Sequence, residues 1–257
     1  MTADANFKIW DGVWALFAEA PAFGPGFNGP IWLNRSIEAA RDAERLLETS
    51  EPLDYALRQR YALLPTITAL LLGEKPRVRI LDFGGGLGTG FIVLAKTVQE
   101  ARNRLDYVVV EGKTICQAGR ELFAGKLGPT FTSELRDDEP YDIVHTASTI
   151  QYIEDWKGLI ASLADYRARY LVLADAFVGN VGSYVTLQKY YDSRLRHWMV
   201  NRDEMVGEVQ RHGYTLALQS VCDARSLGRY GPLPMQNFPP EMRIDHSAHL
   251  LFRRNAS

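Results

Sequence analysis

The sequence predicts an α/β protein in which a doubly wound, mostly parallel sheet follows a helical N-terminal region. Three features support this prediction. From about residue 76 onward, short β-branched and apolar runs alternate with helical patterns, as in a parallel sheet covered on both faces. A glycine-rich turn directly follows the first of these runs. Residues 1–75 show helical spacing and loops but no strand alternation.

Length and composition limit the kinds of protein that this chain can be. A chain of 257 residues suits one sizeable domain with a small appendage, which we expect to be a domain of residues 76–257 and a helical cap of residues 1–75. The net charge of −2 gives no global attraction to nucleic acid. We find no apolar run of about 18 residues and no signal-peptide pattern, so we expect a cytoplasmic protein without a membrane partner.

The two cysteines are far apart and do not have metal-type spacing. We therefore expect no metal site. Cys116 and Cys222 are predicted to be buried or half-buried free thiols in a reducing compartment.

The N-terminal region is expected to fold into helices and one long loop. An aromatic stripe at helical spacing predicts a first helix through Trp10, Val13, Trp14 and Phe17. Residues 22–30 are rich in glycine and proline and predict a loop. A second helix follows with Ser36 as a candidate N-cap, and a third stretch over residues 52–72 must be kinked or divided by Pro65. The region is either a packed cap or a lid over the site with the loop as its moving part.

Seven strands are predicted in the main domain. They cover residues 78–81, 107–110, 129–132, 141–145, 170–174, 214–220 and 249–252. Helical patterns begin at about Thr89, Ile115, Trp156 and Glu204.

The turn after the first strand is the most informative motif in the chain. Asp82, Gly84, Gly86 and Gly88 form the pattern D-x-G-x-G-x-G. The dinucleotide fingerprint G-x-G-x-x-G does not fit, because the sixth residue from Gly84 is Thr89. Glycines serve where a backbone must take a positive φ or pass close to a ligand. By itself the turn could also be purely structural.

This pattern resembles motif I of the class I S-adenosylmethionine-dependent methyltransferases. The resemblance extends over nearly the whole chain through Trp10-Asp11-Gly12-Val13-Trp14, the Val-Val-Val-Glu strand and the Thr-Ile-Gln-Tyr-Ile segment. It implies a Rossmann-like sheet whose last strand inserts antiparallel beside the fifth. It also implies S-adenosylmethionine as cofactor. The chain is similar to a bacterial branch of the family, some of whose members sit among surface-polysaccharide biosynthesis functions.

Several residues are candidates for holding that cofactor. Glu111 ends the second strand, where a carboxylate can accept both ribose hydroxyls. Polar residues after the fourth strand lie at the carboxyl edge, where open α/β sheets bind ligands. The resemblance places the adenine amine near the third strand. The candidate cofactor-binding residues are Asp82, Gly84, Gly85, Gly86, Gly88, Glu111, Ser133, Glu134, Ser148 and Gln151.

The acceptor side is less defined. Gln151 stands where a histidine is often found in the family, and a glutamine cannot act as a general base near neutral pH. We take Gln151, Gln188 and His246 as candidate catalytic residues. The long connection after the fifth strand also offers Tyr184 and Thr186, unless it forms an extra helix from Val185.

Other polar residues have simpler explanations. Arg225, Arg229 and Arg243 could bind an anionic acceptor such as a phosphorylated sugar, although scattered arginines are usually solvated. His197 could serve as a base, and His145 lies in a strand pattern and is expected in the core.

The sequence thus predicts methyl transfer from S-adenosylmethionine to an oxygen or nitrogen of a small-molecule or sugar-type acceptor. The alternative is a non-catalytic protein that binds the cofactor and acts as an assembly or regulatory partner. A nicotinamide oxidoreductase is disfavoured by the spacing of the glycines. The sequence predicts neither the acceptor's identity nor the oligomeric state.

Overall fold

The core of the molecule is a seven-stranded sheet with the strand order β10-β11-β6-β5-β2-β3-β4. The computed structural model describes residues 8–98, 101–135, 140–223 and 231–256. The strands are β2 (Val78–Phe83), β3 (Leu105–Val110), β4 (Thr130–Thr132), β5 (Ile143–Ala147), β6 (Tyr170–Ala176), β10 (Tyr214–Cys222) and β11 (Ser247–Arg254). Strands β2 to β6 run parallel, and β11 lies antiparallel between β6 and β10. The predicted Rossmann-like sheet is confirmed, including its antiparallel last strand.

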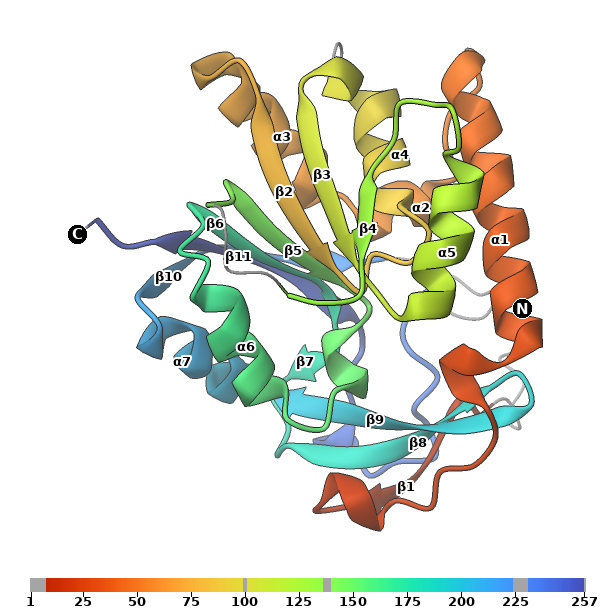
Figure 1. The fold of residues 1–257 in the computed structure, drawn as a ribbon. Coiled ribbons are helices and arrows are strands. Elements are labelled where there is room, and N and C mark those ends of the chain that lie inside the picture. Colours follow the sequence, from red (N-terminus) through yellow and green to blue (C-terminus); the bar gives the residue numbers. More distant parts are fainter. Residues whose placement is uncertain (1–7, 99–100, 136–139, 224–230, 257) are drawn as a thin grey trace.

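Helices cover both faces of this sheet (Figure 1). The helices are α3 (Leu63–Glu74), α4 (Thr89–Thr97), α5 (Lys113–Leu122), α6 (Trp156–Ala164) and α7 (Arg202–Arg211). Because successive side chains of a strand point to opposite faces, neighbouring residues of β2 enter different cores. Ile80 packs with α3 and α4, whereas Leu81 packs with α6 and α7.

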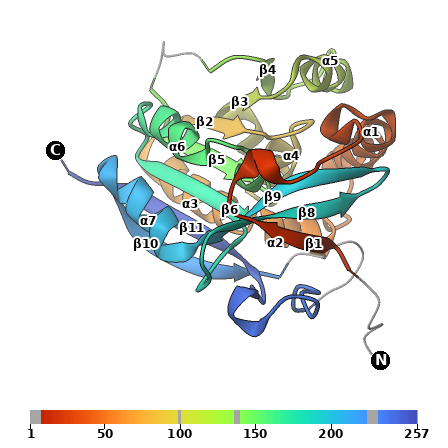
Figure 2. The same ribbon diagram turned by 90° about the horizontal axis from the view of Figure 1, so that it is seen from below.

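A smaller, four-stranded sheet lies below the carboxyl ends of the parallel strands (Figures 1 and 2). Its strands are β1 (Trp10–Trp14), β8 (Tyr184–Tyr190), β9 (Ser193–Asn201) and β7 (Val178–Gly179), in the order β1-β8-β9-β7. Strand β1 pairs antiparallel with β8, so the beginning of the chain joins a hairpin from its second half. Residues of β8 and β9 line one side of a large cavity at this edge of the main sheet.

The predicted first helix is wrong, and the alternative of a helix from Val185 does not hold either, because both segments belong to this small sheet. The stripe at Trp10 and Trp14 fits a helix, but a spacing of four residues also fits a strand of period two. Val13 is exposed, and Gly12 has a φ of 76°, which an α-helix does not allow. Gly12 lies at an irregularity in the pairing of β1 with β8, between Asp11 and Trp14. The segment from Val185 is the strand β8, as its alternating β-branched and aromatic residues favour.

The remaining N-terminal elements are helical, with boundaries that differ from the prediction. They are α1 (Pro30–Arg45), α2 (Tyr55–Arg60) and the 3₁₀ turns η1 (Phe17–Glu19), η2 (Gly26–Asn28) and η3 (Leu46–Glu48). Helix α1 begins at Pro30, a residue suited to a first helical turn, so Ser36 lies inside the helix and is not its cap. The third helical stretch is divided between Arg60 and Leu63, which leaves Pro65 in the first turn of α3.

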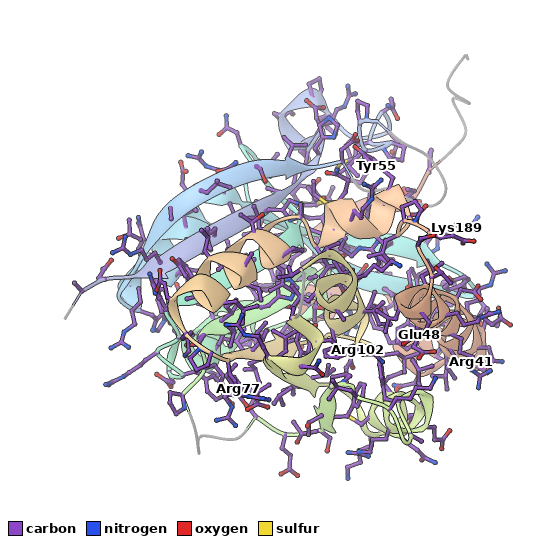
Figure 3. The ribbon with its side chains drawn as sticks, turned by 90° about the horizontal axis from the view of Figure 1, so that it is seen from above. Arg41, Glu48, Tyr55, Arg77, Arg102 and Lys189 are labelled. Atoms are coloured by element: carbon purple, nitrogen blue, oxygen red, sulfur yellow. The ribbon has the colours of Figure 1, made fainter. Side chains whose placement is uncertain are left out.

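Ion pairs attach α1 and η3 to the main domain. Glu48 forms an ion pair with Arg102, at 2.7 Å, in the 3₁₀ turn η4 (Ala101–Asn103), and the two side chains point toward one another in Figure 3. Glu44 pairs with Lys126 at 2.8 Å, and Ala40 packs with Ile115 of α5. The N-terminal region is therefore held against α4 and α5.

Candidate functional site

The glycine turn between β2 and α4 presents bare backbone to a large cavity. Gly84, Gly86 and Gly88 have φ values of 70°, 57° and 79°, which lie in the left-handed region. A Cβ on Gly84 would overlap the Thr149 side chain, so this position requires glycine. A Cβ on Gly86 would meet no protein atom within 4 Å, and Gly86 lines the cavity. At Gly86 the space beside the backbone is therefore open to a ligand.

Asp82 supports this turn from behind. Its side chain is fully buried, accepts a hydrogen bond from the Tyr107 hydroxyl at 2.6 Å and lies 2.7 Å from His145 Nδ1. A Cβ on Gly85 would overlap the Asp82 carboxylate, so the carboxylate lies directly under the turn. Asp82 thus packs under the turn, bonded to Tyr107 and His145, and is not among the residues that line the cavity. His145 is a buried core residue, as predicted.

Glu111 follows β3 and faces the turn across the cavity edge. Its Oε1 accepts a hydrogen bond from the Gly86 N–H at 3.2 Å, and its Oε2 accepts one from the Gly112 N–H at 2.9 Å. Burial raises the pKa of this carboxyl above its usual value, and the two backbone hydrogen bonds oppose that rise. The structure therefore brings Glu111 and the glycine turn together at one edge of the cavity.

The segment after β5 forms the next part of the wall. Thr149 Oγ1 donates a hydrogen bond to the Gly84 carbonyl at 3.3 Å, which attaches this segment to the glycine turn. Gln151, in the 3₁₀ turn η5 (Ile150–Tyr152), is 2% exposed, and neither its Nε2 nor its Oε1 has a partner among the described residues. Tyr152 donates a hydrogen bond to Gln188 Oε1 at 2.6 Å. Gln151 therefore offers a donor and an acceptor to a ligand, because buried polar groups are normally paired.

Aromatic side chains surround the part of the cavity next to Gln188. Residues 23–28 line the cavity, and the loop is held to β9 by a hydrogen bond from the Gly26 N–H to Ser193 Oγ at 3.0 Å. From this loop Phe27 makes edge contacts with Trp32, Tyr152 and Tyr190, at centroid distances of 5.4, 4.9 and 5.4 Å. The cavity has a volume of about 1440 Å³.

An acidic residue at the end of β6 reaches the same cavity. Asp175 is 7% exposed and lines the cavity with Ser148 and Arg60. The hydroxyls of Ser148 and Ser247 both donate hydrogen bonds to its carboxylate. Arg60 Nε lies 3.5 Å from Asp175 Oδ2.

The described part of the chain shows neither a metal-binding cluster nor a membrane-spanning helix. The described ranges hold no group of three or more His, Cys, Asp or Glu side chains that could bind a metal ion. Within the same ranges, no helix is long and apolar enough to cross a bilayer. Both cysteines are buried and are not joined by a disulfide, as predicted.

A comparison with protein families decides the class of this protein. Residues 55–219, well over half of the chain, match the model of a family described as "Methyltransferase domain". The chain belongs to this family. The prediction of a methyltransferase is thereby confirmed. A search of curated proteins finds no match.

Solved structures of other methyltransferases share the fold of this one. Magnesium protoporphyrin IX methyltransferase from Synechocystis PCC 6803, with bound SAH, is 16% identical with a TM-score of 0.51, over 88% of this chain and 99% of that chain. Burkholderia thailandensis 1,6-didemethyltoxoflavin-N1-methyltransferase, with bound 1,6-didemethyltoxoflavin and S-adenosylhomocysteine, is 13% identical with a TM-score of 0.53, over 93% of each chain. At these identities the likeness concerns the fold.

The methyltransferase brings most of the predicted site residues to one cavity. Those that line it are Gly84, Gly85, Gly86, Glu111, Ser133, Ser148, Gln151 and Gln188. The predicted residues outside the described lining are Asp82, Gly88, Glu134 and His246.

Each of these residues has a local reason for its place outside the lining. Gly88 is the N-cap of α4, and a Cβ there would lie 2.7 Å from Pro129. Glu134 is exposed, and its backbone is bonded to Thr132 Oγ1. His246 is half-buried in the segment just before β11.

The other candidate acceptor-binding residues either bond to backbone carbonyls of the protein or lie outside the described residues. Tyr184 donates to the Met242 carbonyl at 2.6 Å, and Thr186 donates to the Asp11 carbonyl at 3.2 Å. Arg243 donates to backbone carbonyls of its own loop. Arg225 and Arg229 lie outside the described residues.

Sequence reasoning missed Asp175 and Arg60. Asp175 carries the same signal that pointed to Glu111, an acidic residue at the end of an apolar strand. Arg60 carries no such signal, because only the folded position of α2 brings it to the cavity.

Proposed function

We propose that this methyltransferase uses S-adenosylmethionine to methylate an oxygen or nitrogen of a small-molecule acceptor. The observation that carries the proposal is the pairing of Glu111 with the glycine turn at the edge of a cavity large enough for two ligands. Small-molecule pockets usually measure about 300–1,000 Å³, and this cavity exceeds that range. A donor and an acceptor must meet in one cavity for a methyl group to pass between them.

The residues around the turn fit the methyl donor. The space beside Gly86 allows a ligand to approach the backbone closely. The two oxygens of Glu111 can accept hydrogen bonds from the two ribose hydroxyls of an adenosyl group. Ser133 lines the cavity on the β4 side, where the resemblance to the family expects the adenine. When bound, the cofactor supplies a methyl group on a sulfonium, which leaves as a neutral thioether.

The contribution of the protein to the reaction would be alignment of the two ligands. Because the leaving group is neutral, no developing anion at sulfur needs stabilisation, and positioning supplies much of the catalysis. Gln151 and Gln188 face the cavity with amide groups that can orient an acceptor. The aromatic side chains around Phe27 offer it an apolar surface and exclude water.

The proposal also has finer parts. A sugar-type acceptor, a place in surface-polysaccharide biosynthesis and a cytoplasmic location rest on the sequence alone. We also propose residues 1–75 as a cap on a methyltransferase domain of residues 76–257. The lining contributed by residues 23–28 and α1 supports that division.

Isothermal titration calorimetry on the purified protein tests the cofactor assignment. We expect S-adenosylmethionine and S-adenosylhomocysteine to bind with one site per chain. NADH, which shares the adenosine but needs a pyrophosphate site, should give no heat. Absence of binding by both adenosyl compounds at millimolar concentration would contradict the proposal.

A further inference from the structure

Two residues at the cavity have a backbone conformation that residues other than glycine rarely adopt. Ser148 has a φ of 53° and Asp175 a φ of 50°. They lie at the carboxyl ends of the neighbouring parallel strands β5 and β6. Such conformations persist only where the surroundings enforce them, and they cluster at ligand sites.

The surroundings of Asp175 do enforce its position. Ser148 donates to Oδ2, and Ser247, from β11, donates to Oδ1. The Asp175 N–H donates to His249 Nδ1 at 3.3 Å. Arg60 approaches from α2 at 3.5 Å. Strands β5, β6 and β11 and helix α2 therefore converge to hold one carboxylate against the cavity.

This carboxylate retains hydrogen-bonding capacity. An ionised carboxylate has about four acceptor positions, and the two serines use one on each oxygen. The positively charged guanidinium of Arg60 lies beside Oδ2, with its Nε at 3.5 Å. A group that binds Asp175 from the cavity must therefore be a hydrogen-bond donor.

The sheet order separates Asp175 from the donor end of the cavity. Glu111 follows β3 and the glycine turn follows β2, whereas Asp175 lies on β6, two strands beyond β2 on the other side. Neighbouring strands lie about 4.8 Å apart, which puts Asp175 roughly 10 Å from the end of β2. The carboxylate thus lies in the half that the adenosyl group would leave open.

We propose that Asp175 binds the hydroxyl or amino group of the acceptor and directs it toward the methyl donor. This inference rests on the proposed function, since it assigns the acceptor half of the same cavity. The acceptor must then present a donor group at Asp175, and a carboxylate in the same place is repelled. Ser148 and Ser247 act as positioning residues, because they touch Asp175 and hold its carboxylate.

The aromatic lining suggests suitable probes for a binding test. Benzylamine, benzyl alcohol and benzoate have the same ring and differ in the group presented to Asp175. Their affinities are measured by calorimetry or ligand-observed NMR on the protein saturated with S-adenosylhomocysteine. We expect benzylamine to bind at least 10-fold more tightly than benzoate, with benzyl alcohol between them.

The isosteric variant Asp175→Asn should abolish this preference and leave the affinity for S-adenosylhomocysteine within about twofold. Asp42→Asn is the matched control, because Asp42 also lines the cavity but is exposed on α1. It should retain the preference. A second variant, Ser247→Ala, should weaken benzylamine binding without reversing the order of the probes.

The inference is wrong if benzoate binds as well as benzylamine, if the preference survives in Asp175→Asn, or if none of the probes binds to 10 mM. Failure of the proposed function has a different signature, since S-adenosylhomocysteine would then not bind to the unsubstituted protein. Thermal melts of each variant separate a loss of binding from a loss of fold.

Discussion

The substitution Glu111→Gln tests the donor site most directly. In the free protein the two oxygens of Glu111 accept hydrogen bonds from two backbone N–H groups. A glutamine has one acceptor oxygen, and its NH₂ group would face an N–H group. With an adenosyl ligand bound, the variant could accept a hydrogen bond from only one ribose hydroxyl, and without charge assistance.

The size of the effect follows from the bond that is lost. A hydrogen bond to a charged group contributes about 1.5–3 kcal/mol. Since about 1.4 kcal/mol corresponds to a factor of ten, S-adenosylhomocysteine should bind roughly 10- to 100-fold more weakly. Calorimetry measures this change. Glu121→Gln, on the exposed side of α5, is the control and should bind normally.

The pH dependence provides a second, independent check. Binding to the ribose requires the ionised form of Glu111, whose pKa is raised by burial. Affinity should therefore fall as the pH drops through that raised pKa, beginning above the usual value of 4.5. The Glu111→Gln variant should lack this acid limb. An unchanged affinity, or an acid limb that persists in the variant, would refute the ribose assignment.

Three further predictions concern the turn and the core. Gly86→Ala should bind S-adenosylhomocysteine at least 10-fold more weakly. Gly125 also has a positive φ and open space around it, so Gly125→Ala should carry the same strain without a binding defect. Equal affinities of the two variants would contradict this prediction. Asp82→Ala should lower the free energy of unfolding in urea by about 3–5 kcal/mol, because it leaves the buried partners of Asp82 unpaired. The control is Asp106→Ala, which removes a partly exposed carboxylate and should lower the free energy of unfolding by less than about 1 kcal/mol. Burial lowers the pKa of His197 to about 3, so the unfolded chain takes up a proton below pH 6.5 and the folded protein does not. The free energy of unfolding should therefore fall by about 2 kcal/mol from this group between pH 7.5 and 5, a loss that His197→Phe removes; equal acid sensitivity of variant and parent would rule this out.

The main sheet and the donor end of the site follow from local signals in the sequence. The apolar strands and the glycine pattern are short-range features, and they led to the correct type of sheet with its antiparallel last strand. They also pointed to Gly86 and Glu111, which line one cavity. The small sheet could not be predicted in this way, because β1 becomes a strand only by pairing with β8. The spacing of Trp10 and Trp14 suits either structure, and the partner that decides between them is far away in the sequence.

The acceptor end was harder for the same reason. Gln151 and Gln188 do line the cavity. Gln151 follows a strand that the sequence predicted, whereas the strand of Gln188 was not predicted. His246 was chosen for its chemistry alone, and the fold leaves it outside the lining. Arg60 comes near Asp175 only through the packing of α2 on the main domain, a contact between segments that no local pattern encodes.

The pairing of Trp10 with Gln188 also has a consequence for biosynthesis. Within the described residues, β1 is an edge strand whose neighbour in the sheet, β8, is synthesised much later. Until then this segment, with its two tryptophans, has no sheet to join, and nascent chains with such unpaired strands are prone to aggregate. A fusion partner placed just before Trp10 would be attached next to this unpaired strand. We therefore expect the yield of correctly folded protein to be more sensitive to a tag there than to a tag placed after β11.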